Sequence, residues 1–330
     1  MKKTNVETFG SAELRAGDTR VVITPVLGGK ITALEMAGRQ WLWHNELIPP
    51  RLPIDGEDAS YAECGDSGGY DECFPTVGAC TLPSWIPSYG GLTLPDHGEL
   101  WSQGAAFVLE THAQSAEGSG LCAKCTWHGR RMPYRFERTI FVEPSGALVM
   151  RYAVTNEGKA RLPFIWCAHP LFPLTSDTRL TLPEGARVRV YSEEGIKLFG
   201  ADAEHVWPRL LTPAGVVDMS RPYAVAKRFA CKLFLDVKGG YAAIEEEGAR
   251  LEVTFDASEV PNFGVWINKR GWAPFRRKRP YENFGFEPSI GAPDTVSDAV
   301  GGWNSAHWLE VGETRRWSLR WRGERLASRS

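Results

Sequence analysis

Two histidines and one glutamate stand out in this sequence as groups that can transfer protons. His97 lies in the segment LPDHGELW, His169 in PFIWCAHPLF and Glu287 in FGFEPSIG, so the three are spread over 190 residues. An imidazole and a carboxylate that face each other across a pocket can pass protons near neutral pH without a metal or a coenzyme. The opening and closing of a sugar ring is chemistry of this kind.

The neighbours of His97 indicate that its ring is presented from a tight turn. Pro95 stands two residues before it and Gly98 directly after it, and both residue types favour turns. Asp96 or Glu99 can orient the imidazole. The alternative interpretation is a solvated loop histidine, because polar loop residues usually face water.

His169 and Glu287 lie in apolar surroundings. His169 ends the apolar run 162–168, and Pro170 is expected to interrupt that strand because it lacks a backbone donor. Glu287 stands among aromatic residues, where burial would require a partner and would raise its pKa. The alternatives are a core histidine with a hydrogen-bond partner and a structural ion pair between Glu287 and an arginine.

Short strand patterns dominate the elements that must position these groups. Apolar residues alternate or run together in segments bounded by Gly, Pro, Asp or Asn, which is typical of strands. These segments are 19–26, 29–36, 105–113, 134–143, 147–156, 186–192, 231–237, 241–247, 249–257, 262–268 and 314–323. The pattern predicts an all-β sandwich formed by one domain over 1–330, with one short helix within 297–306 that starts near Asp294 or Ser297. The Pro/Gly-rich region 48–98 is the least regular part, and we expect it to be an ordered, functional loop.

Four motifs in a fixed order carry a resemblance to a known family. They are Gly68-Gly69 with Phe74-Pro75-Thr76-Val77-Gly78, then Asp96-His97-Gly98-Glu99, then Asn156-Glu157-Gly158 with Ala168-His169-Pro170-Leu171-Phe172, and finally Glu287-Pro288. In this order the chain resembles the aldose 1-epimerase (galactose mutarotase-like) superfamily from about Leu27 to Trp321. The resemblance implies a large antiparallel β-supersandwich, which agrees with the strand patterns.

The resemblance also implies roles for the three proton-transfer residues. His169 would donate a proton to the ring oxygen of a free aldose, and Glu287 would take the proton of the anomeric hydroxyl. His97 would hold the ring oxygen or a neighbouring hydroxyl. The implied function is cofactor-free 1-epimerisation of a monosaccharide.

Five further residues are candidates for binding the substrate. Indole rings stack on the apolar faces of sugars, which makes Trp101 and Trp266 candidates. The acidic candidates are Glu72, Asp96 and Glu99.

The same scaffold leaves two other functions open. Lys232 stands where the mutarotases are expected to carry a sugar-binding aspartate, so a carbohydrate-binding or sensing protein without catalysis is one alternative. The GGYDECFPTVG region resembles the sugar-phosphate epimerase branch more closely, so an enzyme acting on a sugar phosphate is the other. Glu72 and Glu99, however, place negative charge where a phosphate would require cations.

Composition argues against several other classes of protein. The formal net charge of −2 provides no basic field for nucleic acid. No apolar run reaches membrane-spanning length, and no signal peptide is recognisable. Seven cysteines without small-scaffold spacing suit the reducing cytoplasm. Cys122 and Cys125 form an isolated CxxC, which is too few ligands for zinc, and no phosphate-binding glycine motif indicates a nucleotide. We therefore expect neither metal nor cofactor, and we expect the basic run 276–279 to be a solvated loop.

Overall fold

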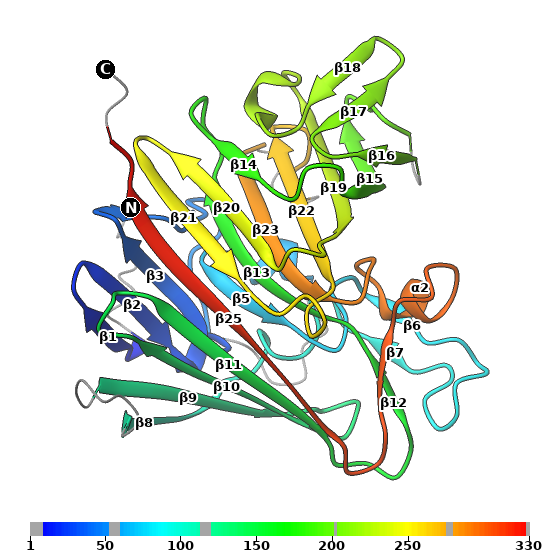
Figure 1. Cartoon of the computed structure of the whole chain (residues 1–330). Helices are drawn as coiled ribbons and strands as arrows, with labels where there is room; N and C mark the ends of the chain where they lie inside the picture. Colours follow the sequence, from blue (N-terminus) through cyan, green and yellow to red (C-terminus); the bar gives the residue numbers. More distant parts are fainter. Residues whose placement is uncertain (1–8, 53–59, 113–119, 201–202, 275–279, 328–330) are drawn as a thin grey trace.

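The computed structural model describes residues 9–52, 60–112, 120–200, 203–274 and 280–327. Within these ranges most regular structure is β-strand, and two large sheets contain most of the strands, as Figure 1 shows. The basic run 276–279 lies outside the described residues, so its expected solvation stays a prediction.

Eleven described strands form the larger sheet, and every pairing between them is antiparallel. In hydrogen-bonded order, with β4 beside β3, they are β1 (Ala12–Ala16), β2 (Thr19–Thr24), β3 (Lys30–Met36), β5 (Tyr70–Cys73), β13 (Trp166–Pro173), β23 (Glu282–Ile290), β22 (Asn262–Lys269), β19 (Phe229–Asp236), β15 (Arg187–Gly195), β16 (Glu204–Val206) and β4 (Arg39–Gln40).

The second sheet contains eight described strands, again antiparallel. Their order is β14 (Arg179–Thr181), β20 (Tyr241–Glu246), β21 (Ala249–Thr254), β25 (Thr314–Arg325), β11 (Leu148–Asn156), β10 (Tyr134–Val142), β9 (Gly120–His128) and β8 (Ala106–His112). Smaller pairs and helices complete the described chain: β12 (Leu162–Phe164) with β24 (His307–Leu309), β17 (Arg209–Thr212) with β18 (Gly215–Asp218), β6 (Cys80–Thr81) with β7 (Thr93–Leu94), α1 (Tyr61–Cys64), α2 (Val296–Val300), and the 3-10 turns η2 (Pro25–Leu27) and η3 (Pro222–Ala224).

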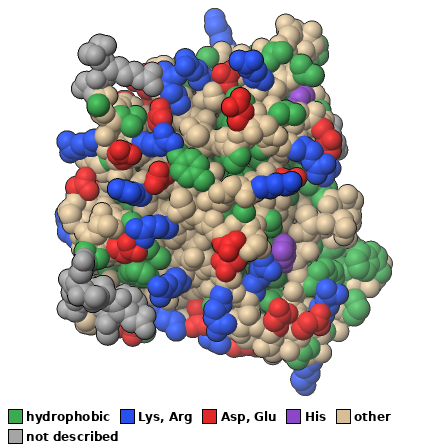
Figure 2. All heavy atoms as spheres, viewed as in Figure 1, with side chains coloured by type: hydrophobic (Ala, Val, Ile, Leu, Met, Phe, Trp, Pro, Cys, Tyr) green, Lys and Arg blue, Asp and Glu red, His purple; other side chains and the backbone are tan. Residues whose placement is uncertain are grey.

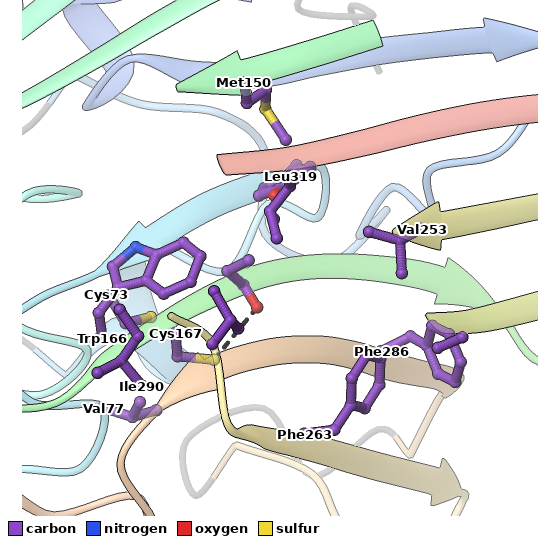
Figure 3. Close-up of a cluster of buried hydrophobic side chains, with 14 of the residues drawn as sticks. Cys73, Val77, Met150, Trp166, Cys167, Val253, Phe263, Phe286, Ile290 and Leu319 are labelled. Atoms are coloured by element: carbon purple, nitrogen blue, oxygen red, sulfur yellow. Dashed lines mark hydrogen bonds between the residues drawn. The ribbon is translucent and has the colours of Figure 1, made fainter. Parts of the chain in front are cut away.

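The core lies between the two sheets and is rich in aromatic rings. Successive side chains of a strand point to opposite faces, so every second residue of the larger sheet faces the other sheet. On β13, Trp166 packs against Trp317 of β25, with ring centroids 4.9 Å apart. Figure 3 shows Phe263 and Phe286 of the larger sheet in the same buried cluster as Val253 and Leu319 of the second sheet.

The fold class expected from the sequence is confirmed, but one local expectation is wrong. Pro170 does not interrupt the strand at His169, because β13 continues to Pro173 and the N–H of Leu171 donates to Gly69 O at 3.0 Å. The short helix α2 begins at Val296, between Asp294 and Ser297, as expected. The Thr295 hydroxyl accepts the N–H of Asp298, as an N-cap side chain does.

The long region 48–98 contains more regular structure than its composition indicated. It includes β5, which is hydrogen-bonded between β3 and β13 inside the larger sheet. The rest of its described part includes α1 and the β6–β7 pair. This region therefore contributes a central strand as well as loops.

The surface and the helices add two observations. Figure 2 shows Lys and Arg side chains interspersed with Asp and Glu side chains over one face of the molecule. This mixing agrees with the near-neutral formal charge of −2. None of the described helices is long and apolar enough to cross a membrane.

One ion pair is completely buried between the sheets. Arg138 of β10 donates to Glu72 of β5, with Nη1 and Oε1 3.1 Å apart, and neither side chain is exposed. Tyr152 and Trp166 also donate to Glu72, at 3.0 and 2.9 Å. Burial raises the pKa of Glu72 to about 7, although Arg138 opposes that shift. The pair therefore needs both partners, because an isolated buried charge is strongly destabilising.

We expect Arg138→Met to reduce the free energy of unfolding by about 3–5 kcal/mol, because it leaves the Glu72 carboxyl buried without its cation. Urea titration followed by circular dichroism measures the change. Arg135→Met, on the same strand, is the control, since that arginine is 35% exposed and its ion pairs are partly open to solvent; its change should stay within about 1 kcal/mol. A loss below about 1 kcal/mol for Arg138→Met would contradict the structural role of the pair.

Candidate active site

The outer face of the larger sheet carries a cavity of about 360 Å³. This volume is within the range of small-molecule sites, roughly 300–1,000 Å³. Strands β13, β23, β22 and β19 supply its floor through His169, Glu287, Trp266 and Lys232. Segments outside the sheet supply further lining residues, which include Tyr61, Asp66, His97, Trp272, Tyr281 and Asp294.

The register of the floor strands brings His169 and Glu287 together. In the β13–β23 pairing Cys167 lies opposite Ser289 and Leu171 lies opposite Gly285, so His169 lies level with Glu287. Both side chains point away from the core, and His169 Nε2 is 3.9 Å from Glu287 Oε1. The strand alternation that buries Trp166 and Phe286 therefore also presents the imidazole and the carboxylate to the cavity.

Glu287 is fully buried, and its two oxygens have different surroundings. Oε2 is bonded to Lys232 Nζ and lies 3.5 Å from the Cys167 thiol. Among the described residues, Oε1 has no hydrogen-bond partner. Burial raises the pKa of Glu287; Lys232 opposes this shift and the charge of Asp294 adds to it. The carboxylate thus has one anchored oxygen and one oxygen able to accept a proton.

His97 is held by its neighbour Asp96. His97 adopts a left-handed backbone with φ 58°, as a residue in a tight turn can. Its Nδ1 is 2.8 Å from Asp96 Oδ1, and its ring stacks on Tyr61 with centroids 4.0 Å apart. The other Asp96 oxygen accepts the N–H of Tyr61 at 2.7 Å. Asp96 and Tyr61 therefore fix both the position and the plane of the imidazole.

The two histidines have opposite pKa shifts. Burial would lower the pKa of His97, but the charge and the hydrogen bond of Asp96 outweigh it and raise that pKa. Burial lowers the pKa of His169 well below its ordinary value, and the positive charges of His97 and Lys232 lower it further. The ring centroids are only 4.9 Å apart, in an edge-to-face arrangement. These shifts favour protonation of His97 over protonation of His169.

The structure brings together five of the eight residues named from the sequence. His97, His169, Glu287, Asp96 and Trp266 all line the cavity. Trp101 instead packs against Tyr61, with centroids 5.2 Å apart, and donates to Asp96 O at 2.8 Å.

Two predicted acidic residues also lie away from the cavity. Glu72 faces the core and binds Arg138. Glu99 accepts the backbone N–H groups of Arg130 and Arg131, at 3.2 and 2.8 Å, and the Tyr134 hydroxyl at 3.0 Å. Both carboxylates therefore have structural partners.

Several lining residues were not predicted from the sequence. The sequence marks Lys232 only as a departure from the expected aspartate and does not indicate its pairing with Glu287. Asp66 is buried and accepts the Tyr281 hydroxyl at 3.1 Å. Tyr61 donates its hydroxyl to Asp71 at 2.6 Å, and Asp71 in turn binds Lys30. No spacing rule in the sequence marks these contacts, because they connect the irregular region to separate strands.

Comparison with known proteins rests on the structure alone. No protein-family model matches the sequence, and no curated protein matches it significantly. A protein from Synechocystis sp. PCC 6803 superposes with a TM-score of 0.65 at 15% identity, over 96% of each chain. A galactose mutarotase related enzyme from Lactobacillus acidophilus gives 0.62 at 15% identity, over 97% of this chain and 99% of that one. A galactose mutarotase-like protein from Lactobacillus casei ATCC 334 gives 0.63 at 15% identity, over 96% of this chain and 100% of that one.

The chain therefore has the galactose mutarotase-like fold, and the resemblance inferred from the four sequence motifs is confirmed at the level of the fold. Identity this low shows the architecture and leaves the activity to be argued from the site.

Two glycines make room for the Glu287 carboxylate. A Cβ on Gly285 would lie 2.2 Å from Oε1, and a Cβ on Gly264 would lie 2.8 Å from Oε2. We expect Gly285→Ala to displace the carboxylate in a crystal structure and to reduce the free energy of unfolding by about 1–3 kcal/mol, as overpacking does. Gly302→Ala is the control, because a Cβ there meets nothing within 4 Å. An unmoved carboxylate in a Gly285→Ala protein of unchanged stability would contradict this account.

Proposed function

We propose that this protein is an aldose 1-epimerase, which interconverts the two anomers of a free monosaccharide without a cofactor. The observation that carries the proposal is the Glu287–His169 pair, a proton acceptor and an imidazole 3.9 Å apart in the floor of a cavity. The fold, shared with a galactose mutarotase related enzyme, supports the same function.

The proposed reaction needs one base and one acid, which act on the two oxygens bonded to C1 of the sugar. Glu287 Oε1 takes the proton of the anomeric hydroxyl while His169 Nε2 gives a proton to the ring oxygen. The bond between C1 and the ring oxygen then breaks, and the anomeric oxygen becomes the aldehyde oxygen. Rotation about C1–C2 and the reverse steps close the other anomer. Both oxygens are bonded to C1, so an acid and a base a few ångströms apart can serve them together.

The walls of the cavity suit a pyranose ring. Trp266 and Trp272 are nearly perpendicular, with an interplanar angle of 86° and centroids 6.0 Å apart. Aromatic rings at such angles can face a sugar on two sides. His97 completes the site as the imidazole that holds the ring oxygen or a neighbouring hydroxyl.

The charges of the lining favour an uncharged sugar over a sugar phosphate. Four carboxylates line the cavity, those of Asp66, Asp96, Glu287 and Asp294. Lys232 is the only lysine or arginine among the described lining residues. Lys232 is already paired with Glu287 and Asp294. A phosphate would therefore meet repulsion in this part of the cavity.

A second candidate function is sugar binding without catalysis. The ion pair between Glu287 and Lys232 favours it, because a carboxylate engaged by a cation is a weaker base. Tight sugar binding by calorimetry without anomer exchange would support this alternative.

All seven cysteines are free thiols, which under either function supports a reducing compartment such as the cytoplasm.

We expect Glu287→Gln and His169→Gln each to lower the rate of anomer exchange about 10²–10⁴-fold, the usual contribution of a positioned acid or base. NMR exchange spectroscopy on α- and β-glucose and galactose measures this rate. His128→Gln is the matched control, since that histidine is exposed on β9 of the other sheet, and its rate should be unchanged. If the wild-type protein exchanges a broad panel of aldoses no faster than buffer does, the proposed function is wrong.

The pKa shifts predict a bell-shaped pH–rate profile with an optimum on the acid side of neutral. The pKa of Glu287 is raised above 4.5, so the base is lost as the pH falls through that raised value. The pKa of His169 is lowered below 6.5, so the donor is lost as the pH rises through that lowered value. Polarimetry between pH 4 and 9 measures the profile. A basic limb above pH 6.5 that Asp96→Asn moves downward would instead assign the donated proton to His97, whose pKa Asp96 raises.

A further inference from the structure

Lys232 is a buried cation in the floor of the cavity. It lies on β19, two strands away from Glu287 of β23, and its residue is 4% exposed. Its Nζ binds Glu287 Oε2 and lies 3.0 Å from Asp294 Oδ1. A lysine is almost never this buried unless it is paired, and here it has two carboxylate partners.

The strand between them is shaped to allow this contact. Gly264 of β22 stands opposite Glu287 in the sheet register. A Cβ at Gly264 would lie 3.4 Å from Lys232 Cε, in addition to its clash with Glu287 Oε2. The absence of a side chain at Gly264 therefore lets the lysine reach across β22 to the carboxylate.

Among the described residues, both hydrogen-bond donors to the Glu287 side chain bind the same oxygen. Lys232 and the Cys167 thiol donate to Oε2, whereas Oε1 has no hydrogen-bond partner among the described residues and faces His169. A carboxylate anchored through one oxygen cannot turn freely about its terminal torsion, so the other oxygen stays where it is.

We propose that Lys232 is a positioning residue for the general base: it holds Oε2 of Glu287 so that Oε1 alone meets the anomeric hydroxyl. This inference rests on the proposed function and extends it. Lys232 stands where a sugar-binding aspartate was expected, and the proposal assigns this lysine a role in the reaction.

The charges around Glu287 show why a cation is needed there. The ionisable groups that face it are His169 and Cys167 of β13, Cys73 of β5, Lys232 of β19, and Asp294 after β23. Burial and Asp294 both favour the protonated carboxyl, and Lys232 favours the ionised carboxylate. Burial would also neutralise Lys232, but Asp294 and Glu287 outweigh it and raise the pKa of the lysine. Lys232 therefore stays charged while Glu287 titrates.

The decisive experiment compares Lys232→Met with Lys232→Arg and with Lys124→Met, which changes a partly exposed lysine on β9 of the other sheet. Loss of the cation should raise the pKa of Glu287, so the acid limb of the pH–rate profile should move to higher pH in Lys232→Met. We expect kcat at pH 7 to fall by about 10–100-fold, part of the full contribution of a base, with a smaller change in KM. Lys232→Arg keeps the positive charge and should retain most of the wild-type acid limb. Lys124→Met should match the wild type.

A double variant separates positioning from simple destabilisation. Lys232→Met/Asp294→Asn removes the repelling carboxylate as well, so its acid limb should return part of the way toward the wild-type pH. Circular dichroism establishes that each variant is folded under assay conditions. An unchanged acid limb and kcat in folded Lys232→Met would overturn the proposal.

A direct titration keeps this inference separate from the proposed function. ¹³C NMR of carboxyl-labelled protein, with the Glu287 signal assigned by its loss in Glu287→Gln, follows the carboxylate without any substrate. A higher Glu287 pKa in Lys232→Met supports the positioning role of Lys232 even if the wild-type protein exchanges no anomers. An unchanged Glu287 pKa overturns the positioning role of Lys232 even if the wild-type protein is an active epimerase.

Discussion

The alternation of side chains along the central strands of the larger sheet is the constraint on which the rest of the structure depends. Each strand has one face toward the second sheet and one face toward the cavity. On β13 this rule buries Trp166 and exposes His169 to the cavity, and on β23 it buries Phe286 and presents Glu287. The strand register that packs the core therefore also assembles the site, because a one-residue slip of register would exchange the two faces.

The same rule separates two buried networks of charge that start on neighbouring residues. On β5, Asp71 binds Lys30 and Tyr61 on the cavity side, whereas Glu72 binds Arg138 between the sheets. Each carboxylate has a cation because an unpaired buried charge is costly. The ion pair of Glu72 with Arg138 joins the two sheets, and the contacts of Asp71 join the larger sheet to Tyr61, which lines the cavity. A buried carboxylate paired with a cation therefore stabilises the chain on each of the two faces of β5.

The sequence predicted the fold class and most of the strands, but it missed β5 and β23 and ended β13 too early, for identifiable reasons. Strand β23 is buried on both faces and β5 lies within a Pro/Gly-rich region, so neither shows a clear alternation of polar and apolar residues. At β13 the proline after His169 indicated an interruption, but hydrogen bonds from β5 on one side and β23 on the other hold the strand together. Pairing with two neighbours outweighs one missing donor.

By itself the sequence determined the strand-rich architecture and indicated His97, His169 and Glu287 as candidates for proton transfer, because periodicity and turn residues are local properties of the chain. Only the tertiary structure decided that Glu72 faces the core, and that Lys232 pairs with Glu287 across 55 positions of sequence. The physical reason is that register and burial are set by strands distant in the chain. Burial lowers the pKa of both histidines, and the charge and hydrogen bond of the neighbouring Asp96 reverse this shift for His97 alone.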